Sequence, residues 1–234
     1  MIEGIRMNSG MNRMKGQAFG VGVGPGDPEL MTLKAVRILQ EADAIACPGK
    51  TLEESTAFKI AVKNVPGITK KELISISVPM TYDRSQQGRE HLESSRRIMK
   101  CLDEGKNVAF IVLGDPTIYS SFSYYQKILE KEGYHTEIIS GVPSFCAVAA
   151  KLNIPLIEWN EQMHVIPLAH QDNLGERYPG TRVYMKAGKK LKELKEHLGQ
   201  EETYTVENCG LEGERVTCGI PDQSDYYTTV IVKD

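Results

Sequence analysis

The chain has 234 residues, of which 41% are hydrophobic and 25% are charged, and its net charge is −3 with an isoelectric point near 6.0. This composition is typical of a globular protein, and the length suffices for one large domain or two modest ones. The lack of a net positive charge argues against nucleic acid as a partner. The longest apolar runs have six residues, whereas a membrane span needs about 20, so the protein is not expected to cross a membrane.

The five cysteines are scattered without a Cys-x-x-Cys spacing, and the five histidines lack a spacing typical of metal ligands. We therefore expect no disulfide framework, no protein metal site and a cytoplasmic location. Residues 1–16 show no hydrophobic periodicity and are expected to form a leader or a disordered start.

The segment 17–154 alternates short apolar strands with amphipathic helices. Strands are predicted over residues 18–23, 44–47, 73–78, 108–113 and 135–139. Helices are predicted over about 31–42, 53–63, 92–105, 116–132 and 145–152. A continuous apolar run such as 108–113 is typical of a strand buried on both faces of a parallel sheet. This segment is therefore predicted to be an α/β domain with a mainly parallel sheet.

The pattern changes in the segment 155–234, which is predicted to be a second α/β domain with a mixed sheet. Strands are expected over residues 163–168, 182–186, 204–207 and 226–232, with one helix that carries leucines at 191, 194 and 198. The lysine-rich stretch 186–195 contains Lys–Glu pairs four residues apart on this helix. We interpret that stretch as a solvated helix face.

Three turns rich in glycine and proline follow predicted strands of the first domain, at residues 24–28, 114–116 and 141–144. In an open parallel sheet, ligands bind beyond the carboxyl ends of the strands. The turns match neither the G-x-G-x-x-G dinucleotide fingerprint nor a phosphate-binding P-loop. The sequence therefore indicates a ligand crevice without the usual phosphate motifs.

The chemistry of these turns favours a neutral or cationic ligand over a polyanionic one. Pro25 and Pro28 lack the backbone N–H groups that bind phosphate. Asp27 and Asp115 add carboxylates to the same turns. The alternative is that both aspartates only cap the helices that follow them.

The turns also carry a resemblance to a known family. The stretches VGVGPGDPELMTLKA (21–35), LGDPTIY (113–119), GVPSF (141–145) and VYM (183–185) resemble, in order, signatures of the tetrapyrrole methylases. These enzymes transfer a methyl group from S-adenosylmethionine to corrin and sirohaem precursors. The resemblance covers residues 17–234 and implies two α/β domains with the cofactor cleft between them, and a homodimer. Met31 stands where leucine is more usual, a volume-conserving change.

The resemblance further implies which residues bind S-adenosylmethionine. They are Pro25, Leu113, Gly114, Asp115, Ile118, Pro143, Ser144, Met185 and Gly210. Asp115 is in addition the candidate general base for removing a proton from the tetrapyrrole. The alternative for this carboxylate is a purely structural or cofactor-binding role.

Within the family, the stretches 46–50, 78–82 and 121–124 resemble the branch that methylates precorrin-2 or cobalt-factor II at ring carbon 20 in cobalamin biosynthesis. Leu113 stands where the uroporphyrinogen branch has glycine, which argues against the early sirohaem step. The candidate contacts to the polycarboxylate substrate are Lys50, Met80, Tyr82, Arg84 and Arg89. Methylation at another corrin position and a non-catalytic cofactor-binding module are the alternatives.

Overall fold

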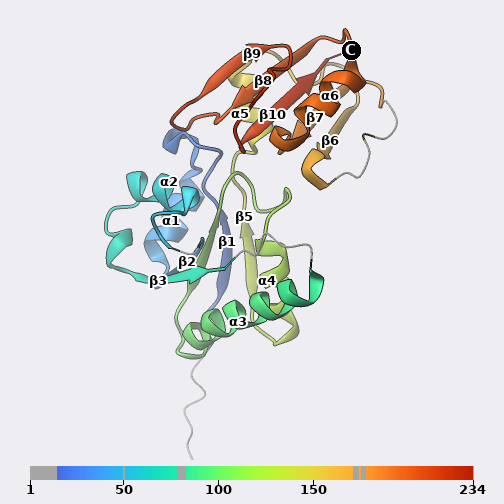
Figure 1. Ribbon diagram of the computed structural model, residues 1–234. Coiled ribbons are helices and arrows are strands. Elements are labelled where there is room, and N and C mark those ends of the chain that lie inside the picture. Colours follow the sequence, from blue (N-terminus) through green and yellow to red (C-terminus); the bar gives the residue numbers. More distant parts are fainter. Residues whose placement is uncertain (1–14, 50, 78–82, 171–173, 175–177, 234) are drawn as a thin grey trace, which may run out of the picture.

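The computed structural model describes residues 15–49, 51–77, 83–170, 174 and 178–233, and Figure 1 shows their arrangement. The strands form two separate five-stranded sheets, one in the first part of the chain and one in the second. The predicted fold class, two α/β units with a parallel and a mixed sheet, is confirmed. No helix in the described ranges has the length and apolar character needed to cross a membrane.

The first sheet is wholly parallel, with the strand order β3-β2-β4-β1-β5. Its strands are β1 (Ala18–Gly22), β2 (Ala44–Pro48), β3 (Glu72–Ile76), β4 (Val108–Val112) and β5 (Thr136–Ile139). Strand β4 lies at the centre, where Ile111 faces one layer of helices and Phe110 faces the other. Burial on both faces explains why this strand is a continuous apolar run.

Four helices cover the two faces of this sheet. They are α1 (Leu33–Glu41), α2 (Thr56–Asn64), α3 (Arg84–Asp103) and α4 (Phe122–Lys131). Helices α1 and α2 share one hydrophobic cluster with the sheet, and α3 and α4 share the other. The first part of the chain is therefore a three-layer structure.

The second sheet is mixed, with the strand order β6-β7-β10-β8-β9. Its strands are β6 (Met163–Pro167), β7 (Thr181–Met185), β8 (Thr203–Glu207), β9 (Arg215–Cys218) and β10 (Thr228–Val232). Only the β6–β7 pair is parallel, and the other pairs are antiparallel. Strand β9 was not predicted from the sequence.

Two helices cover this second sheet, α5 (Ser144–Leu152) on one face and α6 (Leu191–Leu198) on the other. In the α5 layer, Phe145 and Val148 pack with Val183 and Ile231 of the sheet. Helix α5 is thus grouped with the second sheet by packing, although it precedes residue 155 in the chain. The predicted domain boundary after residue 154 stays a prediction.

Short 3-10 turns complete the fold. They span Pro28–Leu30, Ile68–Lys70, Leu168–His170 and Gly188–Lys190. Asp27 caps the first of them, since its side chain accepts a hydrogen bond from the Glu29 N–H at 2.9 Å. Thr32 then caps α1. Asp27 thus caps the short turn, and the helix α1 that follows is capped by Thr32 instead.

Candidate active site

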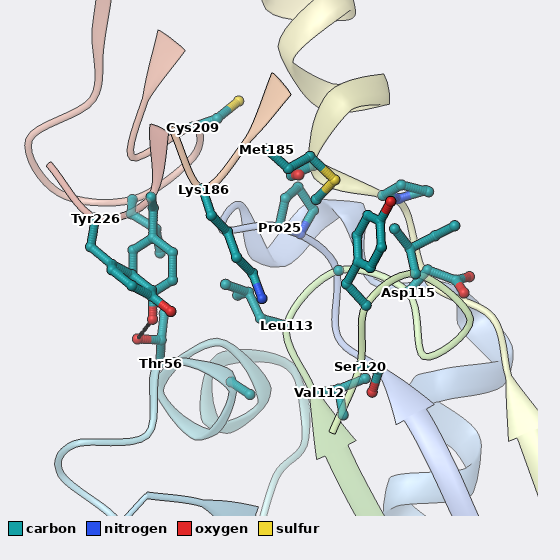
Figure 2. Close-up of a pocket in the computed structure, with 18 of the residues that line it drawn as sticks. Pro25, Thr56, Val112, Leu113, Asp115, Ser120, Met185, Lys186, Cys209 and Tyr226 are labelled. Carbon is teal, nitrogen blue, oxygen red and sulfur yellow. Dashed lines mark hydrogen bonds between the residues drawn. The ribbon is translucent and has the colours of Figure 1, made fainter. Parts of the chain in front are cut away.

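The centre of the first sheet is a point where the chain diverges. Strands β1 and β4 are neighbours, but α1 follows β1 on one face of the sheet and α4 follows β4 on the other. Ligand crevices in open α/β sheets form at such positions. A pocket of about 420 Å³ lies here, lined by the loops that follow both strands and by residues of the second sheet (Figure 2).

The floor of this site is built by close backbone packing of the three glycine-containing turns. Gly24 and Gly114 exchange two hydrogen bonds, with N···O distances of 3.3 and 2.7 Å. A Cβ on Gly22 would lie 2.5 Å from the Gly114 carbonyl oxygen, and a Cβ on Gly141 would overlap the same oxygen. Glycine is required at these positions because no side chain fits between the turns.

Asp115 connects two of these turns. Its side chain is buried, and one carboxylate oxygen accepts hydrogen bonds from the Thr117 N–H at 2.7 Å and from the Thr117 hydroxyl. The other oxygen accepts from the Gly141 N–H at 2.9 Å. The carboxylate therefore holds the loop after β4 against the loop after β5, a positioning role.

Most of the residues expected to bind the methyl donor meet at this pocket. Those that line it are Pro25, Leu113, Gly114, Asp115, Ile118, Pro143, Ser144 and Met185. Gly210 does not line it, but its neighbours Cys209 and Leu211 do. Gly210 instead packs against the backbone of Asp27, so the loop between β8 and β9 supports the turn at residues 24–28. Their roles in binding remain proposals.

Most of the residues expected to bind the tetrapyrrole lie outside the part of the chain that the structure describes. Lys50, Met80 and Tyr82 lie outside the described residues. Arg84 is the first residue of α3, and Arg89 is exposed on the same helix. Arg89 does not line the pocket, and the roles of all five residues stay predictions.

Several lining residues were missed by the sequence analysis because only the fold brings them here. They include Thr56, Ser120, Lys186, Tyr226 and Tyr227. Lys186 was assigned to a solvated helix face, and that interpretation is wrong for this residue. It lies between β7 and the turn before α6, and its position directly after Met185 is the signal that could have found it.

Two hydroxyl contacts join the two halves of the protein around the pocket. The Tyr119 hydroxyl donates to the Val165 carbonyl of β6 at 2.9 Å. The hydroxyls of Thr56 and Tyr227 lie 3.2 Å apart, so α2 touches the segment before β10. Burial raises the pKa of Tyr119, which keeps its hydroxyl a donor. Contacts between the two halves of the protein thus hold the pocket.

No group of three or more His, Cys, Asp or Glu side chains in the described ranges is placed to hold a metal ion. Within the described residues, the surface of the pocket is mostly apolar and also carries hydroxyl groups, two carboxylates and one amine, which is the character of a site for an organic ligand. The fold and the site therefore define an α/β protein with a pocket for a small molecule between its two halves.

Comparison with known proteins gives the family. Residues 18–220 match the family described as Tetrapyrrole (Corrin/Porphyrin) Methylases. The chain is 35% identical, over 95% of its length and 98% of the relative's, to the "Probable cobalt-precorrin-2 C(20)-methyltransferase" of Methanocaldococcus jannaschii. The chain belongs to the tetrapyrrole methylases.

Two further proteins are similar to this chain, one in sequence and one in fold. The precorrin-2 C(20)-methyltransferase of a Sinorhizobium species is 26% identical, over 93% of this chain and 95% of the relative. The solved uroporphyrin-III C-methyltransferase of Thermus thermophilus, complexed with S-adenosylhomocysteine, has a TM-score of 0.66 at 22% identity. That alignment covers 94% of this chain and 98% of the solved one, and it supports the fold.

Proposed function

We propose that this protein transfers a methyl group from S-adenosylmethionine to ring carbon 20 of precorrin-2 or cobalt-factor II, giving precorrin-3A or cobalt-factor III in cobalamin biosynthesis. The observation that carries the proposal is the full-length similarity to a cobalt-precorrin-2 C(20)-methyltransferase, at 35% identity over 95% of the chain. The similarity to a precorrin-2 C(20)-methyltransferase supports the same ring position.

The pocket fits S-adenosylmethionine in size and chemistry. Its volume of about 420 Å³ lies within the range of small-molecule sites. At Gly114, a Cβ would meet only the Ser144 nitrogen and the Val142 oxygen, both 3.9 Å away, so the backbone is open to a ligand. Pro25, Leu113 and Met185 supply apolar surface around it. We expect these residues to hold the donor.

The catalytic contribution of the chain is then mainly positioning. The donor's sulfonium supplies a methyl group that is already activated for attack by a nucleophilic ring carbon. The residues of both sheets hold the reactants in one orientation and exclude water from the pocket. Asp115 acts by fixing the turns that line the pocket, since three hydrogen bonds from Thr117 and Gly141 already occupy its carboxylate.

The assembly and location belong to the same proposal. The family resemblance implies a homodimer. All five cysteines are unpaired, and Cys146 and Cys218 among them are exposed, which favours a reducing cytoplasm. Light scattering during gel filtration tests the dimer, and a monomeric mass at micromolar concentration contradicts it.

The activity is tested by incubating the purified protein with S-adenosylmethionine and either precorrin-2 or cobalt-factor II. We expect one methyl group to appear in the mass of the tetrapyrrole, with release of an equal amount of S-adenosylhomocysteine. A protein that binds S-adenosylhomocysteine but methylates neither tetrapyrrole would be the cofactor-binding module named above. That result would overturn the proposal.

A further inference from the structure

Lys186 is placed in the pocket by an unusual backbone conformation. In a regular strand, Met185 and Lys186 would point to opposite faces of the sheet. Lys186 instead has a φ of +57°, in the left-handed region. Both residues consequently line the pocket, and Figure 2 shows Lys186 reaching from the end of β7 toward Leu113 in the loop after β4.

Backbone contacts with β10 fix the residues on each side of Lys186. Met185 is the last residue of β7 in register with β10, and the Ala187 N–H donates to the Thr228 carbonyl oxygen at 3.2 Å. Lys186 is the single residue between these two contacts. A left-handed conformation is costly for a residue with a Cβ, and such conformations cluster at ligand sites.

The Lys186 ammonium has no counter-charge within the described part of the protein. Of the described residues that line the pocket, only Glu54 and Asp115 are acidic. Glu54 is exposed, and hydrogen bonds tie Asp115 to its own turns. Burial lowers the pKa of Lys186, and no acidic neighbour offsets this effect.

The chemistry that suits this position is a ligand carboxylate. A partly buried ammonium without a partner gains most from an anion that reaches it inside the pocket, away from water. Both proposed ligands offer one, the α-carboxylate of S-adenosylmethionine and the side-chain carboxylates of the tetrapyrrole. We propose that Lys186 is a carboxylate-binding residue that orients one of these ligands in the pocket, an inference that rests on the proposed function.

The test compares four forms of the full-length protein: wild type, Lys186→Met, Lys186→Arg and Lys192→Met. Methionine keeps the apolar stem without the charge, and arginine restores the charge. Lys192 is exposed on α6 and serves as the matched control. Calorimetry measures the affinity for S-adenosylhomocysteine and for 5′-methylthioadenosine, which lacks the carboxylate, and kinetics gives the KM for the tetrapyrrole.

If Lys186 binds the donor, Lys186→Met weakens S-adenosylhomocysteine binding about ten- to hundredfold and leaves 5′-methylthioadenosine unchanged. If it binds the tetrapyrrole, both nucleoside affinities are unchanged and the KM for the tetrapyrrole rises at least about tenfold. In either case Lys186→Arg recovers most of the loss, and Lys192→Met behaves as wild type.

Two outcomes overturn the inference. One is that Lys186→Met changes none of the three quantities by more than about twofold. The other is an equal loss of affinity for both nucleosides, which indicates a packing defect and not a lost charge. A wild-type protein that binds S-adenosylhomocysteine without methylating a tetrapyrrole contradicts the proposed function alone, because the two binding measurements still report on Lys186.

Discussion

Replacing Asp115 by asparagine separates a positioning role from a role as general base. The change keeps the shape of the side chain but turns one acceptor oxygen into an NH2 donor. In the wild-type protein, the Gly141 N–H donates to Asp115 at 2.9 Å. If the remaining oxygen of the asparagine stays with Thr117, its NH2 group faces this N–H, and two donors then oppose each other. The two turns that the carboxylate joins then lose their direct connection.

The expected cost follows from the burial of this group. Asp115 is only 7% exposed, so water replaces the lost bond poorly. Loss of a hydrogen bond to a charged acceptor costs about 1.5–3 kcal/mol. For a chain of this length, about 2 kcal/mol lowers the melting temperature by about 4–8 °C. Because the displaced turns line the pocket, we also expect several-fold weaker binding of S-adenosylhomocysteine.

The assay combines thermal unfolding, calorimetry and steady-state kinetics. We expect stability and donor affinity to fall together in Asp115→Asn, while kcat at saturating donor falls less than about tenfold, below the usual contribution of a general base. Thr117→Val is the control, since it removes the hydroxyl bond to Asp115 but keeps the N–H bonds from Thr117 and Gly141, which still join the two turns. A kcat lowered more than a hundredfold with unchanged stability and affinity would refute this reasoning and make Asp115 the base.

Further predictions concern the closely packed glycines beneath the pocket and the cysteine thiols. Gly141→Ala places a methyl group on the Gly114 carbonyl oxygen, so we expect loss of about 1–3 kcal/mol and of ligand binding in denaturation and calorimetry. Gly88→Ala places its methyl group in open space within α3 and should instead stabilise the protein by about 0.5–1 kcal/mol. Equal changes of stability in the two variants would contradict the packing argument. Burial raises the pKa of Cys47 to about 12, so its reactive thiolate is scarce at pH 8. Mass spectrometry after alkylation should find the exposed Cys218 modified and Cys47 unmodified until unfolding, and early labelling of Cys47 would be the contrary result.

The parallel sheet was predictable because its signals are local. Strand β4 is a continuous apolar run between a turn and a glycine, and such runs are read directly from the sequence. Strand β9 was missed because its residues are mostly exposed and it is held at the sheet edge by pairing with β8. The helix predicted from residue 116 begins only at Phe122, since the intervening loop includes Tyr119 at a φ of +46°.

The site residues that follow the strands of the first sheet were predictable from the sequence. Most of those that the second half of the chain contributes were not. Pro25 and Gly114 lie in turns whose composition stands out in the sequence. Thr56 and Tyr227 are far apart in the chain and meet only through the fold. Lys186 stands in a lysine-rich run whose other members suit a solvent-facing helix. In the structure, Lys186 precedes the helix and has a left-handed conformation, and both features separate it from them.

The ring position of the transferred methyl group is the most direct test of the proposed function. The protein is incubated with S-adenosylmethionine carrying a 13C-methyl group and with precorrin-2 or cobalt-factor II, and the product is examined by 13C NMR. We expect a single labelled methyl group bonded to ring carbon 20. A label at any other ring carbon, or none on either tetrapyrrole, would contradict it.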